Sequence, residues 1–482
     1  RDRLRSRGLG DVYKRQTVFR APLEIADGQA TISWLNNDKG FQLDGRNIDV
    51  KAKAVHARGG FRYLQPANDE PWLGILAGIS TDDGSQAWRY FPENLMGKDL
   101  VDYLSGAIQG GEADNATLVY GGNPQLFPYK HNEGQFEVLV PLRNAKFAFQ
   151  PDWPALTNLD IELDFINDGL WMKTDGVNLG GVRASNLTAV IPDYSKEKLL
   201  IDADIKGPGK AVGPYFDETP LKDSLGATLQ ELQLDGDVNA RLHLDIPLNG
   251  ELVTAKGEVT LRNNSLFIKP LDSTLKNLSG KFSFINGDLQ SEPLTASWFN
   301  QPLNVDFSTK EGAKAYQVAV NLNGNWQPAK IGVLPAAVNE ALSGSVAWDG
   351  KVGIELPYHA GATYNVELNG DLKNVSSHLP SPLAKPAGEP LPVNVKVDGN
   401  LNSFELTGQA GADNHFNSRW LLGQKLTLER AIWAADSKTL PPLPEQSGVE
   451  LNMPPMNGAE WLALFQLSLI HISEPTRPEP IS

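Results

Sequence analysis

The residue types that most often carry chemistry are scattered through this sequence. Its seven histidines, at positions 56, 131, 243, 359, 378, 415 and 471, form no pair at i and i+4 and no HExxH motif. There is no cysteine, so thiolate metal sites and disulfides are excluded and the redox compartment stays open. Motifs for a nucleophile elbow, a Walker A loop or a dinucleotide fold are absent as well. We therefore expect no metal, no cofactor and no catalytic residue.

Three acidic clusters invite a chemical interpretation. Asp82-Asp83-Gly84 and Asp235-Gly236-Asp237 resemble the start of a calcium loop, but neither continues to a distant glutamate, so we interpret both as turns. Asp160, Glu162 and Asp164 form a row of carboxylates such as a glycosidase uses. Their strict alternation with apolar residues indicates instead the solvated face of a strand.

The strand that carries these carboxylates has a wholly apolar opposite face. Residues 159–165 alternate between apolar and acidic without error, and residues 232–246, 316–322 and 393–397 follow a similar alternation. Short clusters of Asn, Asp and Gly bracket such runs and supply the positive φ angles that hairpin turns need. The pattern predicts a mostly β protein whose strands are apolar on one side only.

One segment of this β pattern occurs twice. Residues 142–170 recur without a gap at 261–289, with eleven identities in 29 positions at an offset of 119 residues. Phe165-Ile166-Asn167, for example, returns as Phe284-Ile285-Asn286. A fixed period of this strength predicts a repeat array.

A sheet with one apolar face must be covered by a second layer or must curl until that face meets itself. Helical spacing occurs at residues 93–108, 221–229 and 336–342, and these helices are too few and too short to cover the face. We therefore predict an elongated antiparallel repeating β-groove, a curled gutter or tube, with short interspersed helices and about three repeat units. A filled β-sandwich core is the alternative that alternation alone allows.

The ends of the chain differ in composition from its middle. Residues 1–16 are basic in an acidic chain, and residues 467–482 follow an apolar run with prolines, so both are expected to be non-native sequence flanking a fragment. Between them the predicted organisation has five parts: 17–71, the end of a preceding β unit; 72–211, 212–330 and 331–440, three repeat units; and 441–466, a linker and a truncated helix.

Charge and hydropathy exclude two further classes of protein. The formal net charge is −15, whereas nucleic-acid binding needs clustered lysine and arginine, so no nucleic-acid partner is expected. No apolar run reaches the roughly 18 residues that a membrane-spanning helix requires.

Several motifs carry a resemblance to a known family. Residues 88–96 read WRYFPENLM, residues 127–129 read FPY, and residues 149–154 read FQPDWP. The chain from about Thr17 to Phe465 resembles the central region of the YhdP family, which belongs to the AsmA-like proteins related to TamB. This resemblance implies a non-enzymatic, periplasmic protein of a diderm bacterium, anchored in the inner membrane, that moves phospholipid toward the outer membrane. The membrane-contacting segments would lie outside this chain.

Our hypothesis is therefore transport of phospholipid between the two membranes, with acyl chains held on the apolar face of the groove. The alternative is a carbohydrate-binding or adhesin-like β array that uses exposed tryptophans, with a polysaccharide-cleaving enzyme as a distant third. Protein partners are not specified by the sequence. The predicted lining residues are Phe136, Val138, Val140, Leu142, Leu159, Ile161, Leu163, Phe165, Leu232, Leu234, Val238, Leu242, Leu244, Ile246, Phe282, Phe284, Val318, Val320, Leu322, Val393, Val395 and Val397.

Overall fold

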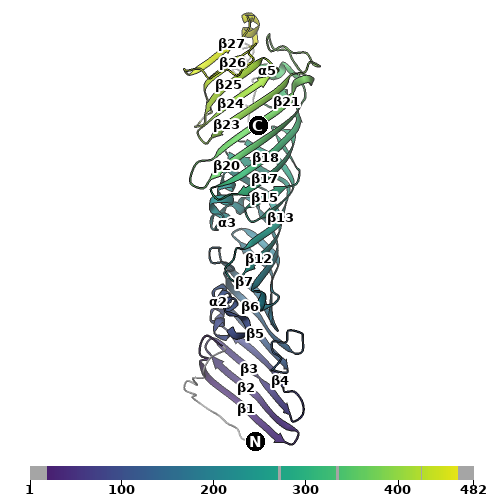
Figure 1. Ribbon diagram of the computed structural model, residues 1–482, viewed down its shortest axis with the longest axis vertical. Coiled ribbons are helices and arrows are strands. Elements are labelled where there is room, and N and C mark those ends of the chain that lie inside the picture. The colour runs from purple at the N-terminus through teal and green to yellow at the C-terminus, as the bar shows by residue number, and fades with distance from the viewer. Residues whose placement is uncertain (1–18, 270–272, 333–335, 425, 465–482) are drawn as a thin grey trace, which may run out of the picture. The chain divides into compact units, whose positions relative to one another are not determined.

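The computed structural model describes residues 19–269, 273–332, 336–424 and 426–464. The chain divides into two compact units. Figure 1 labels strands and helices along the chain. Unit 1 comprises the described residues up to Pro220 together with Val238–Glu258, and unit 2 comprises Leu221–Asp237 and the described residues from Val259 onward. Segments 1–16 and 467–482, which the sequence predicts to be non-native, lie outside the described residues, as do the last two residues of 441–466.

Unit 1 is an antiparallel meander in which consecutive strands from β1 to β10 pair with one another. Its strands are β1 (Ile25–Asn37), β2 (Gly40–Ala52), β3 (Val55–Pro66), β4 (Trp72–Thr81), β5 (Ile108–Gly122), β6 (Gln135–Phe147), β7 (Leu156–Ile166), β8 (Gly169–Leu179), β9 (Val182–Ile191), β10 (Lys198–Pro208) and nearly all of β12 (Asp237–Pro247).

Short helices interrupt this meander mainly between β4 and β5. They are η1 (Gly84–Tyr90), α1 (Glu93–Met96), α2 (Lys98–Ala107), and later η2 (Tyr194–Lys196), η3 (Gly209–Ala211) and α3 (Val212–Asp217). The helix predicted over residues 93–108 is thus present as α1 and α2, divided at Gly97, whose φ of 82° a residue without a Cβ adopts readily.

Unit 2 is also antiparallel, apart from β26 and β27, which pair in parallel. Its strands are β11 (Leu232–Asp235), most of β13 (Thr254–Ile268), β14 (Ser273–Ile285), β15 (Asp288–Ser291), β16 (Leu294–Trp298), β17 (Gln301–Glu311), β18 (Ala315–Trp326), β20 (Val346–Pro357), β21 (Thr363–Asp371), β23 (Pro392–Asn400), β24 (Ser403–Ala410), β25 (Asn414–Leu421), β26 (Thr427–Ala434) and β27 (Gly448–Asn452), with β19 (Leu342–Gly344) and β22 (Val375–Ser377) paired separately. Its helices are η4 (Lys222–Gly226), α4 (Ala227–Glu231), η6 (Pro328–Lys330), α5 (Ala336–Glu340) and η7 (Leu372–Asn374).

The two copies of the sequence repeat share the same backbone irregularities. Asn144, Asn158 and Asn167 have φ values of 48°, 52° and 51°, and the residues 119 positions later, Asn263, Asn277 and Asn286, have φ values of 54°, 53° and 54°. Asparagine tolerates this left-handed region better than most residues. The bulges and turns of the first copy therefore recur at the same positions in the second.

The buried core of unit 1 is formed mainly by residues of β5 to β10, of β12 and of α2. Leu100, Val101 and Leu104 of α2 are fully buried in one cluster with Leu142 and Leu163 from the strands. This corrects the expectation that the helices are too short to cover the apolar face, because four residues of the ten-residue α2 belong to the same buried cluster as Leu142 and Leu163. The fold class, mostly β with antiparallel strands and short helices, is confirmed, whereas the predicted division into three repeat units stays a prediction.

Candidate functional site

In unit 2 four of the predicted lining residues, Val320, Leu322, Val395 and Val397, belong to apolar rows that cross the sheet. Residues that face each other in an antiparallel pair project to the same side, so the pairing of the strands defines each row. One row runs through Phe307, Val320, Val352, Val366, Val397 and Leu406. The next runs through Leu322, Gly350, Leu368, Val395, Gly408 and Phe416. The side chains of the first row are all half-buried.

Glycine in the second row makes room for the large side chain beside it. A Cβ atom on Gly408 would lie 1.9 Å from Cζ of Phe416, so the aromatic ring lies across the glycine. A Cβ atom on Gly350 would lie 2.6 Å from Cδ2 of Leu368 in the same way. The apolar surface is therefore unbroken at the two positions that have no side chain of their own.

In unit 1 the corresponding residues of β6 and β7 form a closed core. Val138 lies opposite Phe165, and Val140 opposite Leu163. Leu163 is 3% exposed and Phe165 is 9% exposed. The rings of Phe165 and Phe91 have centroids 6.2 Å apart, so the segment that leads into α1 packs on this face. Ile246 of β12 belongs to the same cluster.

The remaining predicted lining residues differ in where they lie. The run 232–246, predicted as one alternating stretch, is two strands, because Gly236 has a φ of 92° and separates β11 from β12. Leu232 and Leu234 thus belong to unit 2, and Val238, Leu242, Leu244 and Ile246 to unit 1. Val138 and Val140 are half-buried and pack against the closed core. Of the other predicted lining residues, those that are half-buried are Phe136, Phe282, Phe284, Leu322, Val393, Val395 and Val397, and Val318 is buried. Their contact with a ligand stays a prediction.

An open apolar row is also present in unit 1. The predicted list of lining residues includes none of its members. Ile32, Gly45, Phe61, Ile75 and Tyr120 follow one another across β1 to β5. Apart from Gly45, these residues are half-buried, and α2 does not cover them in the core cluster. The alternation of β1 to β4 was the available signal for this row.

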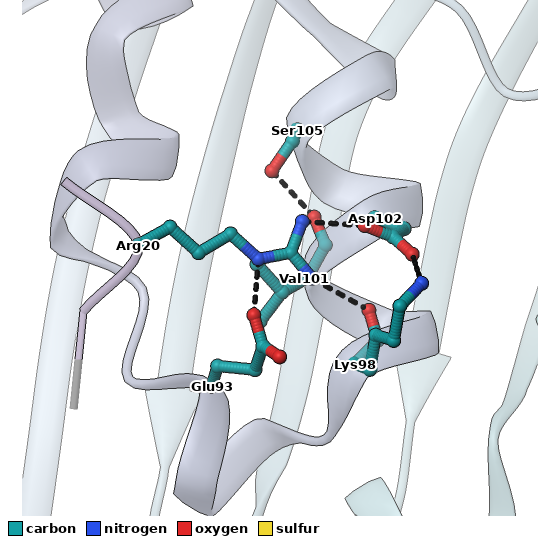
Figure 2. A network of polar contacts seen from close by, with 6 residues as sticks. All are labelled: Arg20, Glu93, Lys98, Val101, Asp102 and Ser105. Carbon is teal, nitrogen blue, oxygen red and sulfur yellow. Dashed lines mark hydrogen bonds and ion pairs between the residues drawn. The ribbon is translucent and has the colours of Figure 1, made fainter. Parts of the chain in front are cut away.

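Arg20 bridges α1 and α2 in unit 1. We call its contacts with Glu93, Asp102 and the carbonyl of Lys98 the arginine latch. Figure 2 shows the guanidinium of Arg20, which precedes β1, between the carboxylates of Glu93 and Asp102, and Arg20 Nη2 also donates to the carbonyl oxygen of Lys98 at 3.2 Å. Hydrogen bonds from Lys98 and Arg20 lower the pKa of Asp102. Because Arg20 bonds to both helices, the chain before β1 fixes the position of the elements that cover the apolar face.

The carboxylate row of β7 lies on the opposite, wet side of the strand. Asp160 forms an ion pair with Arg143 at 3.6 Å, and Glu162 forms one with Lys173 at 3.4 Å. Burial, with the nearby charges of Glu137 and Glu162, raises the pKa of Asp164. The other two acidic clusters behave as turns: Asp83 accepts a hydrogen bond from the Ser85 amide at 3.0 Å at the start of η1, and Asp235 accepts one from the Gly236 amide at 2.9 Å.

The described residues hold no group of three or more His, Asp or Glu side chains placed to bind a metal ion. Within the same residues, no helix combines the length and the hydropathy that a membrane span needs.

Tryptophans of unit 2 pack on one another at the ends of neighbouring strands. The ring centroids of Trp326 and Trp348 are 4.8 Å apart, and those of Trp298 and Phe299 are 4.9 Å apart. Trp326 is 7% exposed. These rings pack against each other. The carbohydrate-binding alternative needs aromatic rings with free faces on which a sugar can stack.

A pocket of about 990 Å³ lies over β2 to β5, and sequence reasoning did not find it. Its lining includes Arg46, Arg58, Arg62, Trp72 and Leu76.

The chain is similar to known proteins. The model of the YhdP protein family matches residues 8–477. The chain is 98% identical over 451 residues to a curated relative from Escherichia coli (strain K12), the intermembrane phospholipid transporter YhdP, an alignment that covers 94% of this chain and 36% of the relative. The chain thus spans about a third of that relative's length. No solved structure matches it. The chain belongs to the YhdP family.

Proposed function

We propose that this chain is part of a non-enzymatic path for phospholipids between the inner and outer membranes of a diderm bacterium. The observation that carries the proposal is the unbroken apolar row from Phe307 to Leu406 in unit 2, whose side chains are half-buried. The name of the E. coli relative, an intermembrane phospholipid transporter, supports the same ligand class. On this proposal the whole protein spans the periplasm and is anchored in the inner membrane through segments outside this chain.

The proposed mechanism is passive. Removing an acyl chain from water contributes roughly 0.8 kcal/mol for each buried CH₂ group, while the headgroup stays in water at the rim of the apolar face. Neighbouring strands present similar side chains along the first row, such as Val352 beside Val366 and Val397 beside Leu406. A lipid that moves along the row from one strand to the next therefore exchanges nearly equal contacts. No covalent step is needed.

The filled face of β6 and β7 determines where the lipid binds in unit 1. Leu163 and Phe165 lie in the buried core, so we place the acyl contacts on the row through Phe61 and Ile75 instead. In unit 2 the contacts lie on β18 to β24. This distribution makes the position of α2 a determinant of the path.

Site-specific photo-crosslinking tests the proposal. A photoreactive amino acid at Val366 is expected to capture phospholipid in the full-length protein, whereas the same residue at Asn365, whose side chain is on the other face of β21, is expected to capture none. Mass spectrometry of protein purified without detergent identifies the lipid. If position 366 captures no lipid, or both positions capture it equally, the proposed face is wrong.

A matched pair of substitutions connects binding to transport. Val366→Asp places a charge on the apolar row and is expected to abolish lipid transfer between donor and acceptor vesicles, whereas Asn365→Asp places the same charge on the wet face and is expected to leave transfer unchanged. Tryptophan-dependent glycan binding by the unmodified protein, without any lipid, would favour the carbohydrate-binding alternative.

A further inference from the structure

The outer face of β1 to β4 is more apolar than an ordinary solvated face. The outer face is the side opposite the row of Phe61 and Ile75, and it carries Leu35, Leu64 and Trp72 in one cross-strand row with Gln42. Leu35 is 55% exposed, Trp72 is 42% exposed, and Leu76 on the same face is 66% exposed. The equivalent face of β7 carries carboxylates. Contiguous exposed apolar side chains mark a binding surface more often than an ordinary surface.

Glycines form the floor of the pocket on this face. Gly60 lies opposite Leu76, Gly74 opposite Arg62, and Gly78 opposite Arg58. The ring of Trp72 leans over Gly74, where a Cβ atom would lie 2.2 Å from the ring. At Gly78 no atom lies within 4 Å of the position of a Cβ, so the floor there is open. Large side chains therefore surround a hollow of about 990 Å³.

Arginines supply the charge of the pocket. Arg62 donates to the buried Asp44 at 2.7 Å and is held in place by it, and this bond lowers the pKa of the Asp44 carboxyl. The side chains of Arg46 and Arg58 are 65% and 70% exposed. Arg58 contacts Asp49 through Nε at 3.0 Å, which leaves its two terminal nitrogens as donors. The lining holds three arginines and one aspartate in a chain whose net charge is −15.

We propose that this pocket binds the headgroup of an anionic phospholipid. Guanidinium groups bind phosphate oxygens in a bidentate geometry, so Arg46 and Arg58 hold the phosphodiester. Trp72 and Leu76 contact the glycerol backbone and the first acyl carbons, since tryptophan favours the boundary between polar and apolar groups. The lipid class rests on the proposed function. The arginines, Trp72 and Leu76 lie on the face opposite the row of Phe61 and Ile75, and the pocket lining also includes Phe61, Ile75 and Tyr120 of that row. The site would hold lipid beside the path, with a preference for negative headgroups.

Calorimetric titration of the purified chain with soluble short-chain lipids tests this proposal. Dihexanoyl phosphatidylglycerol below its micellar concentration is expected to bind at least about tenfold more tightly than dihexanoyl phosphatidylcholine, and the double variant Arg46→Gln/Arg58→Gln to bind phosphatidylglycerol about tenfold more weakly. The control Arg143→Gln/Lys173→Gln removes two charges from the wet faces of β6 and β8 and is expected to change nothing. Equal binding of the two lipids, or full affinity in the Arg46/Arg58 variant, overturns the proposal.

Two further arms separate the remaining explanations. Inorganic phosphate that binds as tightly as phosphatidylglycerol would show a plain anion site and overturn the lipid assignment. Gly78→Leu fills the open floor without changing charge, and it is expected to weaken phosphatidylglycerol binding about tenfold; unchanged binding would place the ligand elsewhere. Crosslinking from Val366 in the Arg46/Arg58 variant reports on the transport rows independently, so the two proposals fail separately.

Discussion

Strands β7 and β21 have the same alternating pattern but different surroundings. In β7, Leu163 is 3% exposed and packs in the same cluster as Leu104 of α2. In β21, Val366 is half-buried, and its neighbours in the row are side chains of β20 and β23. The apolar face of β7 lies in a buried core that includes residues of α2, whereas Val366 of β21 is half-buried.

The difference lies outside the strands themselves. The covering element in unit 1 is α2, whose Leu100, Val101 and Leu104 are fully buried, and Arg20 binds α1 and α2 together. The helices of unit 2 with described residues, such as the five-residue α4 and α5, are shorter than the ten-residue α2. Alternation thus specifies that a face is apolar, and the intervening helices decide whether that face is core or binding surface.

The largest expected effect is a difference in stability between a charge placed on the apolar face of β7 and one placed on the apolar face of β21. Leu163→Asp buries an unpaired charge in a filled core and is expected to destabilise unit 1 by about 3–5 kcal/mol, because the carboxylate loses its hydration without gaining a partner. Val366→Asp is expected to cost no more than about 1–2 kcal/mol, since its side chain keeps partial access to water. Hydrogen exchange of the β7 and β21 amides measures each effect locally.

Glu162→Gln and Asn365→Asp are the controls, one on the wet face of each strand. Similar losses from Leu163→Asp and Val366→Asp would mean that the two faces are equally filled, and the distinction between core and binding surface would fail.

A smaller effect is expected at the latch that maintains the difference. Arg20→Ala removes the hydrogen bonds to Glu93, Asp102 and the Lys98 carbonyl, and it is expected to lower the protection of α2 amides by about 1 kcal/mol. Arg143→Ala, which breaks an exposed ion pair with Asp160, is expected to cost less than about 0.5 kcal/mol.

The same latch has a defined pH dependence. The pKa of Asp102 is lowered in the folded protein, so its contribution is present above the unfolded value near 3.8 and is lost as the pH falls through the folded pKa. The effect of Arg20→Ala should therefore shrink in acid. An effect independent of pH, or no effect on α2, would show that the helices hold their position without the latch.

The sequence predicted the features that depend on local rules. Alternation over residues 159–165 placed Asp160 on the wet face and Leu163 on the apolar face, and the 119-residue offset matched asparagines such as Asn144 and Asn263 that share a left-handed backbone. The turn interpretation of Asp82-Asp83-Gly84 was confirmed because an aspartate side chain can cap the amide two residues later.

Features that depend on pairing between distant residues were missed. The pocket over β2 to β5 exists because glycines of β3 and β4, such as Gly60 and Gly78, face large side chains on the neighbouring strand. No spacing within either strand shows that relation. The filling of β7 was missed for the same reason, since the apolar positions of α2 do not reveal the strand on which they pack.

The smallest predicted effect concerns the wet side of the filled strand. One carboxylate oxygen of Asp164 is buried without a hydrogen-bond partner among the described residues, and burial and then Glu137 and Glu162 raise the pKa of Asp164. A raised carboxyl pKa means that the folded state binds the proton more tightly than the unfolded state. Stability contributed by the protonated form is therefore lost as the pH rises from 3.8 through the folded pKa.

Asp164→Asn removes this charge and is expected to stabilise unit 1 at pH 7 by no more than about 0.5 kcal/mol, with the gain vanishing near pH 3, where the native aspartate is protonated. Denaturant titrations at the two pH values measure it. Asp160→Asn is the control, because Asp160 is exposed and paired with Arg143, so its replacement should give no gain at pH 7. If Asp164→Asn increases stability equally at both pH values, the effect comes from packing. The charge of Asp164 would then not destabilise the folded state.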